Sequence, residues 1–210
     1  GDTVPKSHSG IGHTRWATHG GPTDTNAHPH LDNEGKLALI HNGIIENYVE
    51  LRAELEKRGH KFTSETDTES VVHLLSDARK KHNGDLAAAM REVCKELRGS
   101  FTLLAIHSDE PDRIVGARRN SPLVVGVGDG ENFLASDVAA FIAHTKRALE
   151  LGQDEVVDIQ PNSITITNLA GDVLPPKEYE ISWDASAAER GGYQHFMLKE
   201  IYEQPKAVAD

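Results

Sequence analysis

Apolar and polar residues follow two periods along the chain, one typical of strands and one typical of helices. Residues 37–40 form a short apolar run, and the pair Asn42-Gly43 follows directly. From residue 48 to residue 55 apolar side chains recur every three or four positions, up to Gly59, which is typical of a helix end. The pattern predicts a strand that passes through a tight turn at Asn42-Gly43 into a helix.

The helical period continues in two further segments. Thr66 and Glu69 have the spacing of a capping box, so a second helix is predicted to begin near Asp67. A third apolar stripe covers residues 86–97, and Cys94 lies on its flank. Because an unpaired cysteine is among the most buried residue types, we interpret Cys94 as a core residue rather than a nucleophile.

After Gly99 the pattern changes to strands. Apolar runs separated by Asp, Pro and Gly predict an antiparallel meander. These runs cover residues 101–106, 114–117, 123–127 and 132–135. The segment Gly126-Val127-Gly128-Asp129-Gly130 could cradle a phosphate, but Asp-Gly between two apolar strands is the stronger signal of a hairpin turn.

The remainder of the chain adds short elements and a final helix. Ser136 is predicted to cap a helix over residues 138–144, and residues 156–157 and 163–167 have the composition of strands. A last helical segment is predicted from about His195 to Gln204. Runs of strands beside runs of helices indicate an α+β layered fold.

Composition narrows the classes of function. The chain has 210 residues with 38% hydrophobic content, enough for one substantial core. Its 33 acidic and 22 basic side chains give a formal charge of −11, which disfavours binding to nucleic acid or to a membrane surface. The single cysteine cannot form an intrachain disulfide, and the first residues lack the pattern of a signal peptide, so we expect a cytoplasmic location.

The densest group of polar side chains lies at residues 13–20, His-Thr-Arg-Trp-Ala-Thr-His-Gly. If residues 10–17 form a strand, His13 and Arg15 share one face. The planar fork of an arginine matches the two oxygens of a carboxylate, so Arg15 is a candidate for holding an acidic substrate group. An ordinary surface ion pair is the structural alternative.

Two further positions allow a structural and a functional interpretation. A carboxylate such as Asp67 in the first turn of a helix is stabilised by the helix dipole and needs no ligand. Asn42 and Gly43 could place an amide side chain and a backbone N–H at one point and form an oxyanion hole, although most Asn-Gly pairs are only turns.

The histidines leave a metal-dependent hydrolase open as an alternative. The chain has 12 of them, and alternate residues of the segment His28-Pro29-His30 could ligate one metal from a strand. Pro29 and the lack of an obvious carboxylate set count against this hypothesis, and we assign no metal ligands.

Three motifs in this order resemble the glutamine-binding motifs of class II glutamine amidotransferases. They are residues 13–20, His41-Asn42-Gly43-Ile44-Ile45-Glu46-Asn47 and Ser64-Glu65-Thr66-Asp67-Thr68-Glu69. Within that group, four further segments are similar to the glucosamine-6-phosphate synthase family, the glutamine:fructose-6-phosphate aminotransferases. These are Leu97-Arg98-Gly99-Ser100-Phe101, Ser121-Pro122-Leu123, Ala135-Ser136-Asp137 and residues 199–205.

The resemblance implies an N-terminal-nucleophile hydrolase fold, an αββα four-layer sandwich with antiparallel sheets, here incomplete at the N-terminus. Residues 1–194 would form the type 2 glutamine amidotransferase domain, and residues 195–210 a helical connection toward a sugar isomerase domain. The domain would hydrolyse L-glutamine to L-glutamate and supply ammonia for making glucosamine 6-phosphate from fructose 6-phosphate. No cofactor is implied, and the full-length enzyme is expected to be a homodimer.

The resemblance also implies roles for individual residues. Arg15 would hold the α-carboxylate of glutamine, and Asp67 would pair with its α-ammonium. Thr18 and His19 would line the pocket and bond the substrate. Trp16 would lie toward the channel through which ammonia leaves.

The reacting groups would come from two parts of the chain. Asn42 and the N–H of Gly43 would stabilise the tetrahedral oxyanion. In the family the nucleophile is a cysteine at the processed N-terminus, whose own α-amine is the general base. Gly1 offers neither thiol nor hydroxyl, so the resemblance predicts that the nucleophile segment precedes it and that these residues alone do not hydrolyse glutamine.

Two alternatives keep the same pocket. A noncatalytic glutamine- or glutamate-binding domain would retain Arg15 and Asp67 without a nucleophile. Another class II amidotransferase, of the amidophosphoribosyltransferase or asparagine synthetase type, would pass ammonia to a different acceptor. The segment 199–205 favours the hexosamine branch.

Overall fold

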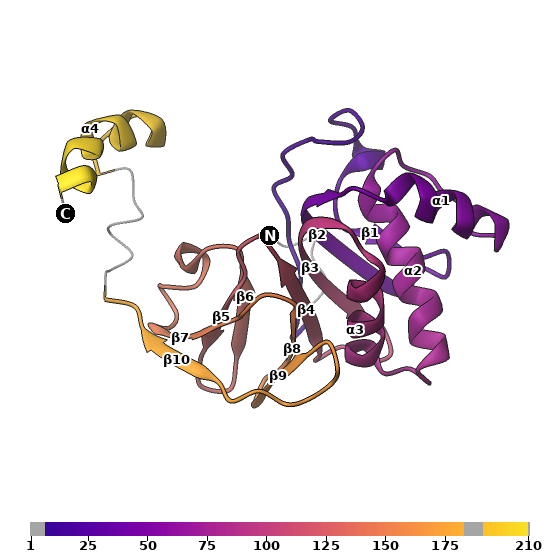
Figure 1. The fold of residues 1–210 in the computed structure, drawn as a ribbon. Helices are drawn as coiled ribbons and strands as arrows, with labels where there is room; N and C mark the ends of the chain where they lie inside the picture. The colour runs from indigo at the N-terminus through magenta and orange to yellow at the C-terminus, as the bar shows by residue number, and fades with distance from the viewer. Residues whose placement is uncertain (1–6, 183–190, 210) are drawn as a thin grey trace.

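Two antiparallel sheets form the centre of the molecule, in a computed structural model that describes residues 7–182 and 191–209. The larger sheet has the order β1 (His30–Leu31), β2 (Leu37–Ile45), β3 (Gly99–His107), β4 (Ile114–Arg119), β8 (Glu155–Gln160) and β9 (Ser163–Asn168). The smaller sheet has the order β10 (Lys177–Glu180), β7 (Arg147–Glu150), β5 (Val124–Val127) and β6 (Asn132–Ala135). Figure 1 shows both sheets beside the helices, which confirms the predicted α+β class.

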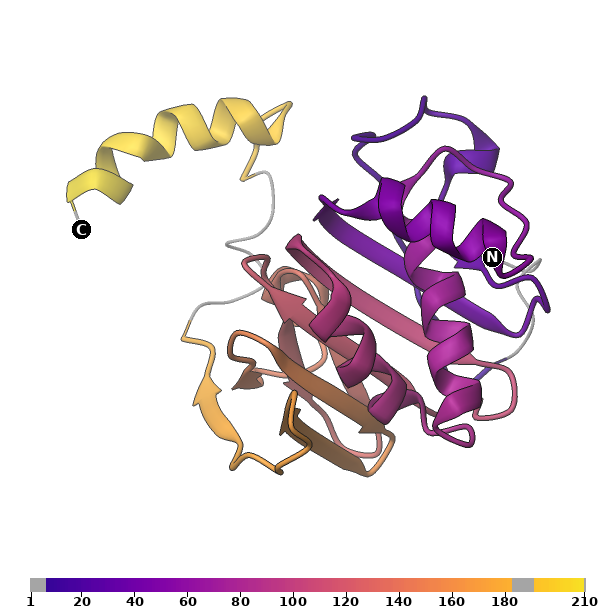
Figure 2. The same cartoon turned by 45° about the vertical axis from the view of Figure 1, so that its right-hand side comes forward.

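Three helices cover the outer face of the larger sheet, as the two views show (Figures 1 and 2). They are α1 (Tyr48–Lys57), α2 (Asp67–Lys81) and α3 (Leu86–Glu96). Their predicted positions are confirmed, and so is the cap at Thr66, whose side chain accepts a hydrogen bond from the N–H of Glu69. Each helix packs an apolar face against the sheet. This packing holds the start of α2 beside the end of β2.

Strand β2 separates two cores. Leu37, Leu39 and Ile45 pack with the helices, whereas Ile40 packs between the two sheets. Alternate side chains of a strand point to opposite faces, so one strand contributes to both layers. A third apolar cluster around Phe141 covers the far face of the smaller sheet.

The predicted turn at Asn42-Gly43 is wrong. Strand β2 runs through both residues, with Asn42 opposite Thr102 and Gly43 opposite Phe101 in β3. The strand continues because β3 pairs with it along its whole length, and tertiary pairing overrides the turn propensity of Asn-Gly. Gly43 has φ +114°, and a Cβ there would lie 2.1 Å from the carbonyl oxygen of Ser100, so only glycine fits.

The second half of the chain departs from the predicted meander. Strand β4 lies in the larger sheet and β5 in the smaller, so the chain changes sheets between them. The hairpin at Asp129-Gly130 is confirmed, since β5 and β6 pair antiparallel. The predicted cap at Ser136 is wrong, because Asp137 accepts the hydrogen bond from Ala139 and the helix is a single 3₁₀ turn, η2 (Val138–Ala140).

Two segments complete the description. Residues 10–17 do not form the predicted strand, because no described strand pairs with them. The last predicted helix is confirmed as α4 (Phe196–Ala209), which lies apart from the sheets in Figure 1. Within the described ranges, no helix has the length and apolar content needed to cross a membrane.

Candidate active site

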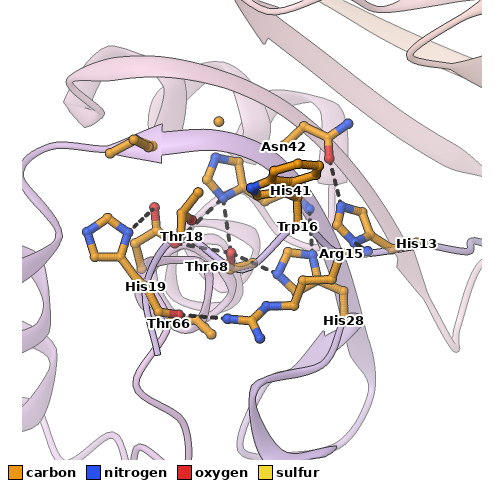
Figure 3. A pocket seen from close by; sticks show the side chains of 13 residues that line it. His13, Arg15, Trp16, Thr18, His19, His28, His41, Asn42, Thr66 and Thr68 are labelled. Atoms are coloured by element: carbon orange, nitrogen blue, oxygen red, sulfur yellow. Dashed lines mark hydrogen bonds and ion pairs between the residues drawn. The ribbon is translucent and has the colours of Figure 1, made fainter. Parts of the chain in front are cut away.

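A cavity of about 280 Å³ lies where the loop before β1, the end of β2 and the start of α2 meet. The structure brings all the sequence-predicted site residues to this one cavity. Its lining includes Arg15, Trp16, Thr18, His19, Asn42, Gly43 and Asp67. Figure 3 shows the side chains around it.

Asp67 supplies a buried negative charge at the first turn of α2, with 3% of its surface exposed. Its Oδ2 accepts a hydrogen bond from the N–H of Ile45 at 2.9 Å. The Nδ1 atoms of His41 and His19 lie 3.8 and 3.9 Å from its carboxylate oxygens. Burial lowers the pKa of His41 to about 4, so this imidazole is neutral near pH 7 and adds no positive charge beside the aspartate.

Arg15 is held by the chain that follows it. Its Nη1 donates to the carbonyl of Gly21 at 2.9 Å, and its Nη2 donates to those of His19 and Gly20 at 2.7 and 3.1 Å. Within the described residues no carboxylate forms an ion pair with Arg15, so the surface-pair alternative finds no partner there. The three carbonyls fix a guanidinium beside the cavity before any ligand arrives.

Asn26 connects the Arg15 loop with the segment that leads to Asp67. Its side chain is 2% exposed and donates to the carbonyl of Gly21 and to the carboxylate of Glu65, both at 3.1 Å. Its Oδ1 accepts from the N–H of Glu65 at 3.0 Å. The two segments that carry the cavity's opposite charges are therefore joined through one buried amide.

Glu69 holds the other end of the same segment. Its carboxylate accepts hydrogen bonds from the N–H groups of Thr63 and Ser64 at 2.7 and 2.6 Å and from both hydroxyls at 3.0 and 2.7 Å. Burial alone would raise the pKa of Glu69, but His73 and these donors outweigh it and lower the pKa to about 2. The charged form thus orders the approach to Asp67.

Gly43 lies on β2 between two residues whose N–H groups face the cavity. The N–H of His41 donates to His28 at 3.3 Å and that of Ile45 donates to Asp67 at 2.9 Å, both on the cavity side of β2. Alternate residues of a strand direct their N–H groups to the same edge, so we expect the N–H of Gly43 to face that edge as well. The Asn42 side chain lies at the same place, where its Oδ1 is 2.7 Å from Nε2 of His13. An oxyanion hole at this point therefore does not need the predicted turn.

Residues 13–143 match the family model described as a glutamine amidotransferase domain. The chain belongs to the glutamine amidotransferase domain family.

The curated relatives that this chain matches are longer proteins. A glutamine–fructose-6-phosphate aminotransferase (isomerizing) of Streptomyces coelicolor is 64% identical over 207 residues, which are 99% of this chain and 34% of that relative. The enzymes of the same name from Corynebacterium glutamicum and Aquifex aeolicus are 57% and 51% identical and cover 99% and 98% of this chain. Only 33% and 34% of those two relatives are covered, so the chain spans about a third of their length.

Solved structures show the fold of the amidotransferase domain. The glutamine phosphoribosylpyrophosphate amidotransferase of B. subtilis, complexed with ADP and GMP, has a TM-score of 0.59 at 24% identity, over 77% of this chain and 35% of that chain. A structure titled as the allosteric regulatory enzyme of purine biosynthesis has a TM-score of 0.61 at 26% identity, with the same coverage. Together with the two antiparallel sheets, these neighbours confirm the N-terminal-nucleophile amidotransferase fold.

The rim of the amidotransferase cavity is more open than its base. Trp16 is 92% exposed, so its indole borders the cavity without packing against a core. Thr18 is also exposed, whereas His19 is half-buried with its ring edge against Tyr48, 4.8 Å between centroids. The loop therefore places exposed side chains at the rim of the cavity, and the held charges of Arg15 and Asp67 lie below them.

The metal-dependent alternative is not supported by the geometry of its two histidines. Nδ1 of His28 accepts the N–H of His41, and its Nε2 pairs with Thr68 at 3.3 Å. Nε2 of His30 pairs with the hydroxyl of Thr66 at 3.0 Å. Across the part of the chain that the structure describes, no group of three or more potential ligands is placed to hold a metal ion.

Cys94 lies in the helical core, as predicted. It is 1% exposed on α3, outside the cavity lining, and burial raises the pKa of its thiol to about 12. A thiol that stays protonated at neutral pH is a poor nucleophile. The cavity must therefore obtain its nucleophile from elsewhere if it acts on an amide.

Sequence reasoning missed several residues that line the cavity. These are His13, His28, His41, Thr66 and Thr68. The sequence does show polar side chains in alternation at these places. His-x-His at 28–30 suggests a metal site, and Thr-x-Thr at 66–68 includes the predicted helix cap. In the structure His28 and His41 both bond Thr68, and His13 bonds Asn42, which no spacing rule predicts.

Proposed function

We propose that this amidotransferase domain hydrolyses L-glutamine and supplies ammonia for making glucosamine 6-phosphate from fructose 6-phosphate. One observation supports the proposal: a buried carboxylate, a fixed guanidinium and the pair Asn42-Gly43, which could donate to an oxyanion, line the same cavity. Glutamine offers an ammonium, a carboxylate and an amide carbonyl, which are the complementary groups.

The charged groups of the cavity account for binding. The guanidinium of Arg15 would hold the α-carboxylate of glutamine with its positive charge and with the N–H groups that the three backbone carbonyls leave free. Asp67 would pair with the α-ammonium, and the neutral imidazole of His41 would not compete for it. Thr18 and His19 at the rim would bond the substrate, and Trp16 would lie toward the exit for ammonia.

The reaction would proceed through a tetrahedral intermediate. A cysteine thiolate attacks the side-chain amide carbon of glutamine, and the developing oxyanion is stabilised by the Asn42 amide and the Gly43 N–H. Collapse breaks the amide C–N bond and releases ammonia with the proton that the α-amine of the cysteine took from its thiol, and water then hydrolyses the thioester to glutamate. Cys94 cannot take this role, so we infer a nucleophile outside these 210 residues, without which the chain does not hydrolyse glutamine.

The names of the curated relatives support fructose 6-phosphate as the acceptor of the ammonia. In this proposal residues 1–194 form the glutaminase domain, and residues 195–210 lead to a sugar isomerase domain of a cytoplasmic homodimer. The phosphoribosylpyrophosphate amidotransferase structure, at 24% identity, shares the fold and favours no particular ammonia acceptor. The far higher identity to the aminotransferases favours the hexosamine branch.

Labelling the full-length protein with an electrophilic ketone analogue of glutamine tests the proposal. We expect one labelled cysteine outside residues 1–210, protection by glutamine, and labelling slowed at least tenfold in Arg15→Lys and Asp67→Asn. The matched control is Arg113→Lys, which alters an ion pair with Asp158 away from the cavity and should label normally. Equal labelling of all variants, or label on Cys94, would contradict the proposal.

A further inference from the structure

His13 lies between a group that grips the substrate and a group that stabilises the reacting oxygen. Its Nδ1 is 2.9 Å from the backbone N of Arg15, and its Nε2 is 2.7 Å from Oδ1 of Asn42. One imidazole therefore contacts both halves of the cavity, as Figure 3 shows. Neither of its bonds is explained by the roles proposed above.

The two bonds fix the tautomer of His13. A backbone N–H can only donate, so Nδ1, which accepts from Arg15, carries no proton. A neutral imidazole with an unprotonated Nδ1 carries its proton on Nε2. That N–H donates to Asn42, so the atom of the carboxamide that faces His13 is its oxygen.

The orientation of the Asn42 amide follows from this donor. A carboxamide whose oxygen is held by His13 must turn its NH₂ group to the opposite side. If the amide were reversed, its NH₂ would meet the Nε2–H of His13 and both donors would be unpaired. The side of Asn42 that is turned away from His13 is thus its donor side, and stabilising an oxyanion requires a donor.

The ring of His13 rests on a second fixed imidazole. The centroid of His28 lies 4.2 Å from that of His13, with the rings 35° apart. His28 is itself held by the N–H of His41 and by Thr68. Burial, together with the neighbouring imidazoles, lowers the pKa of His28 to about 3, so it adds no charge beneath His13.

We propose that His13 is a positioning residue, which fixes the Asn42 carboxamide with its NH₂ toward the oxyanion through an Nε2–H···Oδ1 bond. The inference rests on the proposed glutaminase function. It assigns His13 no contact with the substrate, so its loss should lower kcat and leave KM for glutamine nearly unchanged.

Two substitutions at His13 separate this role from simple packing. In His13→Gln the terminal amide can place an N–H where Nε2 lies and keep the bond to Asn42. In His13→Asn the shorter side chain can accept from Arg15 but does not reach Asn42. We would measure steady-state glutamate formation by the full-length protein, with His60→Asn as a control histidine that bonds Asp77 away from the cavity.

We expect His13→Asn to lower kcat at least about 10-fold, and by no more than the roughly 10²–10³-fold that removal of one oxyanion donor costs. Its KM should stay within about threefold of the wild-type value. His13→Gln should recover most of the loss, and His60→Asn should match the wild type. Unchanged kcat in His13→Asn, or a rise in KM alone, overturns the inference. If the wild-type full-length protein forms no glutamate, the proposed glutaminase function is wrong, and the inference that rests on it is wrong as well.

A spectroscopic measurement on the unaltered protein tests the same claim without any substitution. Long-range ¹H–¹⁵N spectra of the full-length protein labelled in histidine report which ring nitrogen carries the proton, and comparison with His13→Gln assigns the His13 signal. We expect the Nε2–H tautomer at neutral pH. A proton on Nδ1 overturns the inference, even if His13→Asn proves too unstable to assay.

Discussion

The two sides of the cavity are built in different ways. On one side Asn42 and Gly43 belong to β2, which pairs with β3 along nine residues. On the other side Arg15 lies in a loop without regular structure, held by three backbone carbonyls, and Asp67 begins a helix. We call these the strand side and the loop side.

The difference matches the chemistry proposed for each side. Oxyanion donors must keep their direction while charge develops, and a strand inside a sheet provides that rigidity. Charges that grip a zwitterion act on binding, and a loop tied by hydrogen bonds can place them without closing the cavity. We therefore expect the strand side to control kcat and the loop side to control KM, in assays of the full-length protein.

The largest effect should come from Gly43→Ala on the strand side. The added Cβ would clash with the carbonyl oxygen of Ser100, so β2 must move and displace both of the proposed oxyanion donors. We expect kcat for glutamine hydrolysis to fall by at least 10²–10³-fold. Gly35→Ala is the matched control, because Gly35 has φ +68° but no atom within 4 Å of its Cβ position. It should cost about 1–2 kcal/mol of stability and leave kcat unchanged.

Arg15→Lys should give the next largest effect, on the loop side. Lysine keeps the charge but cannot donate to three carbonyls and a carboxylate together. Loss of one charge-assisted bond, worth about 1.5–3 kcal/mol, predicts a 10- to 100-fold rise in KM for glutamine. Steady-state kinetics would measure this rise. A fall in kcat at constant KM would contradict the expectation that the loop side controls KM.

Asn26→Ala should have a smaller effect in the same direction. It removes the buried link between the Arg15 loop and Glu65, which we expect to raise KM about 10-fold. Asn33→Ala is the control, because Asn33 also links two segments, through exposed bonds with the backbone of Lys61 at 2.8 and 3.0 Å, outside the cavity. Equal KM values in the two variants would contradict a role for the link.

The smallest expected effect is a local loss of stability in acid around Glu69, in the segment that leads to Asp67. Its folded pKa of about 2 lies below the ordinary 4.5, so its contribution is complete above pH 4.5 and is lost as the pH falls toward 2. Hydrogen exchange over residues 63–66, corrected for intrinsic rates, should lose protection across this window in the wild type. Glu69→Gln should be less protected at neutral pH and show a weaker pH dependence. The same pH dependence in both would contradict the assignment.

The sequence predicted the helices better than the site geometry. Periodicity and a capping box were enough to place α2, because Thr66 and Glu69 act locally. The turn predicted at Asn42-Gly43 failed because pairing with β3 is decided by a segment more than 50 residues away. Spacing could not show that His13 joins the two sides, or that Asn26 joins the two segments of the loop side, since their partners come from separate parts of the chain. Roles for Arg15 and Asp67 came from resemblance, and the structure adds their shared cavity.

The most direct test of the account compares Asn42→Ala with Asp67→Asn in the full-length protein, measuring kcat and KM for glutamine hydrolysis in parallel. We predict that Asn42→Ala lowers kcat about 10²–10³-fold with little change in KM, and that Asp67→Asn raises KM at least 10-fold with a smaller change in kcat. The opposite assignment, or equal effects on both constants in both variants, would contradict a cavity that divides glutamine binding from oxyanion stabilisation.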